Sequence, residues 1–67
     1  MSTQEIRTFI AETKGLLKVH LSDGRKFEIK HMDFLQLHPV GDGMFLFNTD
    51  GSYIVINRHH ITSLEPL

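Results

Sequence analysis

The chain has 67 residues, 40% hydrophobic and 22% charged, and we expect a single domain over residues 1–67. Because it has no cysteine, disulfides and thiolate metal sites are excluded. Its net charge of −1 argues against a general binder of phosphate backbones. No apolar run approaches the ~20 residues of a membrane span, so we expect a cytoplasmic protein that does not bind membranes. A core of this size supplies only ~3–5 kcal/mol, which favours self-association.

Residues 2–14 predict a short amphipathic helix. Ser2 and Glu5 have the spacing of a capping box at its start, and Gly15 follows its end. Its less polar residues recur at helical spacing, namely Ile6, Phe9, Ile10 and Thr13. Since so short a helix is marginal alone, we expect this stripe to cover one opening of a small β-barrel. The alternative is a helix that binds a partner or lies on a membrane surface.

Residues 17–29 predict a β-hairpin, because apolar and polar side chains alternate on both arms. A two-residue turn would place apolar side chains opposite charged ones. A three-residue loop at 22–24 avoids this mismatch and also sets Lys18 opposite Glu28 on the solvent face. The remaining pairs of that register are Leu21 with Arg25, Val19 with Phe27, and Leu17 with Ile29. The burial pattern therefore favours the three-residue loop.

Residues 30–38 have an ambiguous period, and we expect a turn followed by a short strand, with a loop over 39–43. Residues 43–57 predict a second hairpin, whose loop at 49–51 has the same chemistry as the first loop. Here both faces are apolar. One face carries Met44, Leu46, Ile54 and Ile56, and the other carries Phe45, Phe47, Tyr53 and Val55.

One of these faces can fill a barrel, but the other needs a second cover. We take Phe45, Phe47, Tyr53 and Val55 as the candidate interface of a homo-oligomer. The N-terminal helix is the alternative cover. The chain then continues with a one-turn helix or tight bend near residue 58 and a last short strand that ends at Pro66.

One helix followed by about five short antiparallel strands predicts a mainly β fold. We expect residues 16–65 to form a small, bent barrel of the SH3-like or Sm-like kind.

Three segments resemble a group of short bacterial proteins to which no activity is attached. They are residues 19–25 (VHLSDGR), 31–37 (HMDFLQL) and 60–65 (HITSLE). This resemblance implies a compact, soluble bacterial protein, and it implies no function.

Residues 57–66 (NRHHITSLEP) resemble the second motif of Sm-like proteins of the Hfq type, an aromatic-Lys-His-Ala-Ile-Ser-Thr run before the last strand. The resemblance implies a hexameric ring whose pore binds uridine-rich single-stranded RNA through Arg58 and His59. The sequence departs from the motif at Asn57, which replaces the aromatic residue, and at His60, which replaces the small one. In addition, residues 30–43 are longer than in that family, and the second strand lacks the glycine at which Sm strands bend.

Arg58, His59 and His60 form the densest polar cluster, either as a nucleic-acid contact or as an exposed turn. The five histidines show no i, i+4 pair typical of metal sites, and no nucleophile motif is present. We therefore expect no metal, no cofactor and no catalytic residue. The sequence predicts a non-enzymatic binding or regulatory module that forms a homo-oligomer and contacts an unknown protein, with single-stranded RNA binding as the alternative.

Overall fold

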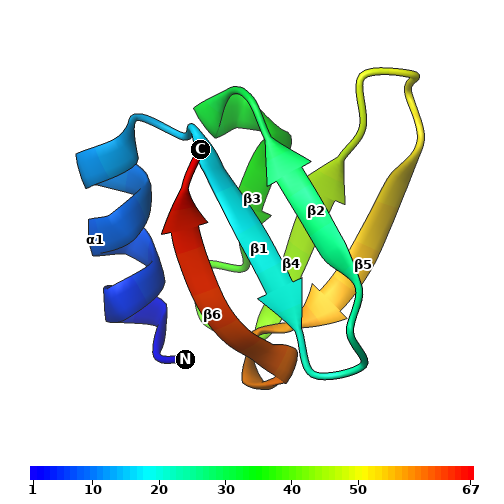
Figure 1. The fold of residues 1–67 in the computed structure, drawn as a ribbon. Helices are drawn as coiled ribbons and strands as arrows, with labels where there is room; N and C mark the ends of the chain where they lie inside the picture. The colour runs from blue at the N-terminus through cyan, green and yellow to red at the C-terminus, as the bar shows by residue number, and fades with distance from the viewer.

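The computed structural model describes residues 1–67, with one α-helix, six β-strands and two single-turn 3-10 helices, η1 and η2 (Figure 1). In chain order the elements are α1 (Thr3–Thr13), β1 (Leu17–Leu21), β2 (Lys26–Ile29), η1 (Met32–Phe34), β3 (Leu35–Leu37), β4 (Gly43–Phe47), β5 (Tyr53–Asn57), η2 (Arg58–His60) and β6 (Ile61–Pro66). The mainly β class and the N-terminal helix are confirmed.

The strands form two antiparallel sheets, one in the order β2-β1-β6 and the other in the order β3-β4-β5. The predicted closed barrel of about five strands is therefore wrong, since six strands form two open sheets. The physical reason lies after Ile29, where β2 ends. Residues 30–34 turn the chain through η1, which His31 caps by accepting a hydrogen bond from the Asp33 backbone N–H at 3.1 Å. As a result β2 and β3 belong to different sheets.

The first helix begins and ends as its sequence predicts. The Ser2 hydroxyl accepts from the Glu5 backbone N–H, and the Glu5 carboxylate accepts from the Ser2 backbone N–H, each at 3.1 Å. Past Lys14, the chain turns at Gly15 with a φ of +81°. A Cβ at Gly15 would lie 2.3 Å from the backbone nitrogen of Met32, so only glycine fits where the chain leaving α1 passes η1.

Both hairpins have the predicted three-residue loops. The Leu21 N–H donates to the Arg25 carbonyl at 2.9 Å, and the Asn48 N–H donates to the Ser52 carbonyl at 2.8 Å. The predicted register is confirmed along both ladders, including Lys18 opposite Glu28 in the first. Gly24 and Gly51 close the loops with φ values of +91° and +92°.

The hydrophobic core draws on every strand and on α1. Its buried side chains are Ile6, Leu17, Val19, Leu21, Ile29, Leu35, Met44, Leu46, Ile56 and Ile61. Ile6 is fully buried, and Phe9 and Ile10 pack beside it, so the helical stripe joins the core as expected. The predicted inner face of the second hairpin supplies Met44, Leu46 and Ile56, which leaves the opposite face of that hairpin free.

Candidate interaction surface

The outer face of the second hairpin, which we define as the side chains of Phe45, Phe47, Tyr53 and Val55, is an exposed apolar surface. Register places Phe47 opposite Tyr53 and Phe45 opposite Val55. The Phe45 and Phe47 rings are stacked with centroids 5.9 Å apart, and the Tyr53 ring lies 6.0 Å from Phe45 and 5.9 Å from Phe47. The prediction that these side chains share one face is confirmed.

Three of the four side chains of this outer face are exposed, and Phe47 is half-buried. Phe45 is 39% exposed, and Tyr53 and Val55 are each 58% exposed. Helix α1 packs into the core through Ile6 instead, so the alternative of an intramolecular cover does not hold. The role of the outer face as an oligomer interface stays a prediction.

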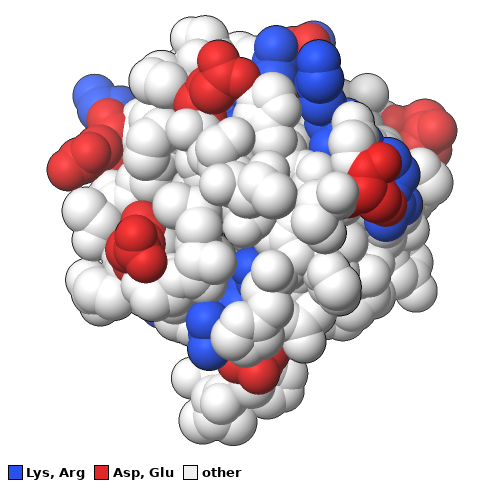
Figure 2. Space-filling model, turned by 60° about the horizontal axis from the view of Figure 1, so that its bottom comes forward, with Lys and Arg blue, Asp and Glu red and all other residues white.

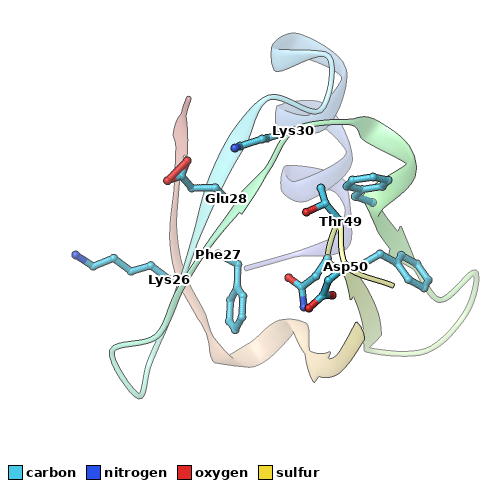
Figure 3. A pocket seen from close by; sticks show the side chains of 9 residues that line it. Lys26, Phe27, Glu28, Lys30, Thr49 and Asp50 are labelled. Carbon is cyan, nitrogen blue, oxygen red and sulfur yellow. The ribbon is translucent and has the colours of Figure 1, made fainter. Parts of the chain in front are cut away.

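A hollow of about 510 Å³ adjoins the outer face at Phe47. It lies between β2 and the loop that joins β4 to β5 (Figure 3). The Phe27 ring points into it, whereas Lys26 and Glu28 extend from the same strand away from it.

Arg58, a predicted nucleic-acid-binding residue, is held by contacts within the chain. Its guanidinium donates from Nε to the Asp42 carboxylate at 3.0 Å and from Nη1 to the Met1 carbonyl at 2.9 Å. Its Nη2 lies 2.9 Å from the same carboxylate, and its side chain is only 22% exposed. Asp42 also faces His59, with the Nε2 atom 3.4 Å away. The Asp42 carboxylate thus brings the side chains of Arg58 and His59 together, and it is also the group with which both side chains interact.

The other histidines serve local structure. The His38 Nδ1 accepts from the backbone N–H groups of Val40 and Gly41, at 3.1 and 2.7 Å, and shapes the loop before β4. His20 pairs with Glu65 across β1 and β6. No three His, Cys, Asp or Glu side chains gather in a group that could hold a metal ion.

Carboxylates with altered acidity lie in turns and caps. The Arg25 backbone N–H, 3.0 Å from the Asp23 carboxylate, and then the Arg25 side chain lower the pKa of Asp23. The Ser52 hydroxyl at 2.6 Å, and then the Ser52 backbone N–H, lower the pKa of Asp50. All these partners favour the ionised form, so these groups stabilise loops and are poorly suited to proton transfer near neutral pH.

Charges of both signs are scattered over the surface shown in Figure 2, and no large area of one sign forms. Such a surface does not steer a strongly charged partner. None of the helices is long and apolar enough to cross a membrane.

Sequence reasoning missed Asp42 as the partner of Arg58, because the two residues are brought together only when the loop before β4 meets η2. The backbone confirms this contact, since the Arg58 N–H donates to the Asp42 carbonyl at 2.9 Å. Its only sequence signal was an aspartate between two glycines, which is equally typical of an ordinary turn.

No family model, curated protein or solved structure matches this chain. The two resemblances described above therefore rest on the quoted residues alone.

Proposed function

We propose that this protein is a non-enzymatic binding module that self-associates and contacts another protein through its outer face. The observation that supports this function is the packed cluster of Phe45, Phe47 and Tyr53 on a sheet face most of whose side chains are exposed. Contiguous apolar patches on small proteins mark interaction sites, and aromatic residues are enriched at the centres of interfaces.

The energetics favour covering this face. Transfer of the exposed half of one Tyr or Phe side chain out of water contributes on the order of 2 kcal/mol. A domain of this size has a total stability of only a few kcal/mol. An oligomer or a complex that covers Tyr53 and Val55 would therefore add a substantial fraction of the stability of the isolated chain.

The test is a charge placed on the outer face. Tyr53→Asp and Phe45→Asp should each lower the mass measured by light scattering toward that of one chain, because an interface cannot bury an unpaired carboxylate cheaply. Val40→Asp is the matched control, since Val40 is 91% exposed in the loop before β4 and lies outside the outer face. An unchanged mass in outer-face variants with a native circular dichroism spectrum would contradict the proposal.

We also propose that the fold is an open relative of SH3-like and Sm-like barrels. The order of elements supports this relation, because a helix, an early hairpin and a single 3-10 turn before the last strand occur in the predicted order. The break between β2 and β3 accounts for the opening, since it falls in the segment 30–43 that is longer than in Sm-like proteins.

Single-stranded RNA binding is the second candidate function, and one observation favours it. Three aromatic rings on an exposed sheet face are a stacking platform for unpaired bases. It ranks second because Arg58 and His59 face Asp42 and the net charge is −1.

A labelled oligo-uridine at low salt tests this alternative. Binding by stacking would weaken in Phe47→Ala and Tyr53→Ala, and binding by the resemblance to the Sm motif would weaken in Arg58→Ala. The absence of any binding at low salt would remove this function.

A further inference from the structure

The two open sheets leave four strand edges, and three of them carry features that discourage pairing with another chain. The β2 edge presents Lys26 and Glu28, and the β6 edge ends in Glu65 and Pro66. The β3 edge is only three residues long. Charges, proline and shortness are the common means by which proteins protect an edge.

The β5 edge carries none of these features. Its five residues, Tyr-Ile-Val-Ile-Asn, include no charge, no proline and no glycine. Its pairing with β4 is regular from Tyr53 to Asn57, without a bulge. An apolar, regular and unprotected edge of this length is a predicted site of strand pairing.

The register shows which backbone groups are free on β5. The bond between Asn48 and Ser52 makes that pair a hydrogen-bonded one, so the bonded pairs continue with Ile54 and Ile56, which face β4. The backbone N–H and C=O groups of Tyr53, Val55 and Asn57 therefore point away from β4, toward the open edge. No backbone bond outside the helices and strands involves these groups.

There is also open space beside this edge. A second hollow, of about 460 Å³, is lined by Val55, Ile56 and Asn57 on one side and by the first hairpin loop on the other. The first hollow, described above, lies between β2 and the loop that joins β4 to β5. Space therefore remains between the β5 edge and the first hairpin loop, which faces the edge across the second hollow.

We propose that β5 pairs with β5 of a second copy of this chain, antiparallel and about a two-fold axis through Val55. The free groups fix this register, because Val55 then exchanges backbone hydrogen bonds with Val55 of the partner subunit, and Tyr53 does so with Asn57 of the partner subunit. This edge pairing is a second contact between copies, in addition to the outer-face association proposed above, because it leaves the outer face free. Phe45→Asp should therefore abolish outer-face association and leave the edge-paired dimer intact.

A second copy suits this edge better than a different partner for two reasons. A two-fold contact uses the same edge twice, and this edge is neutral, so no like charges meet. The pairing also places Ile54 opposite Ile56 of the partner subunit, which covers the half-buried Ile54. The two outer faces then join into one continuous sheet surface, which is a larger platform for the protein partner proposed above.

Proline at position 55 tests this pairing selectively. Val55→Pro removes an N–H that points to the open edge and leaves the ladder between β4 and β5 intact, because the N–H of Val55 does not bond to β4. The matched control is Glu28→Pro, since Glu28 lies opposite Lys18 in a non-bonded pair and its N–H also points to an open edge, that of β2. In a Phe45→Asp background, which removes outer-face association, we expect by sedimentation velocity a dimer without further change and with Glu28→Pro, and a monomer with Val55→Pro.

Amide hydrogen exchange on the unmodified chain keeps the inference testable if the proline variant fails to fold. In the dimer, exchange at Val55 and Asn57 should slow by about tenfold or more as concentration rises, and exchange at Lys26 and Glu28 should not change. A dimer in which Val55 and Asn57 still exchange rapidly would overturn the edge pairing and leave outer-face association standing. A larger closed ring would overturn the two-fold pairing, and a monomer at all concentrations would overturn both proposals.

Discussion

The two hairpins of this protein share a loop but differ in their faces and edges. Both turn through three residues of the type Ser/Thr-Asp-Gly, and both have a glycine with φ near +90° at the end of the loop. In the first hairpin polar side chains alternate with apolar ones, so one face is buried and the other is wet. In the second hairpin both faces are apolar, and only one of them is buried.

The comparison separates what a loop determines from what the strands determine. The loop fixes the register of the strands. The same register occurs in the first hairpin, which has one polar face, and in the second hairpin, which has two apolar faces. The free edges differ in the same direction, because β2 carries charges and β5 carries none. The exposed apolar face and the uncharged edge thus both belong to the hairpin of β4 and β5.

The largest difference in unfolding free energy should come from truncating one side chain on each face of the second hairpin. Leu46→Ala removes a side chain that is 1% exposed and should lower the free energy of unfolding by about 2–5 kcal/mol. Val55→Ala, on the outer face, should change the unfolding of the dilute monomer by less than about 0.5 kcal/mol. Urea unfolding at low protein concentration measures both values, and equal costs would show that the outer face is part of the core.

A smaller effect should be common to both loops. Gly24→Ala and Gly51→Ala should each cost about 1–2 kcal/mol, because their positive φ strains any L side chain while no neighbour lies within 4 Å of the added Cβ. Gly43→Ala is the control, since it also has open space but no positive φ. Thermal unfolding of the three variants measures these costs. A much larger cost in one loop than in the other would contradict the claim that the two loops are equivalent.

The smallest effect on the free energy of unfolding should appear at acidic pH and should be common to the two loop aspartates, Asp23 and Asp50. Because the folded-state pKa values of Asp23 and Asp50 lie below the ordinary value of 3.8, their contribution to stability is present above that pH. It is lost as the pH falls below 3.8 through the lowered values. Asp23→Asn and Asp50→Asn should therefore each reduce the dependence of unfolding free energy on pH below 4 and leave it unchanged between pH 5 and 7. Curves that coincide with that of the unmodified chain would contradict the carboxylate contacts.

Much of the local structure could be predicted from the sequence, since short-range chemistry decides it. The Ser2–Glu5 capping box, both loops and the alternation that places Tyr53 on the outer face each depend on residues close together in the chain. These features were predicted with their register.

The sheet topology and the surroundings of Arg58 could not be predicted, because they depend on contacts between distant segments. The turn after Ile29 separates β2 from β3, and no local signal distinguishes this break from a bend within a barrel strand. Asp42 lies sixteen residues before Arg58 and approaches it only in the folded chain. The resemblance to the Sm motif selected Arg58 and His59 but gave no information on their acidic neighbour.

The most direct test of the proposed self-association is the solution mass of the unmodified chain over a wide range of concentration. We predict that sedimentation equilibrium will show a mass that rises from that of one chain, 7.7 kDa, to at least twice that value. A mass that stays at 7.7 kDa up to the highest soluble concentration would contradict the account.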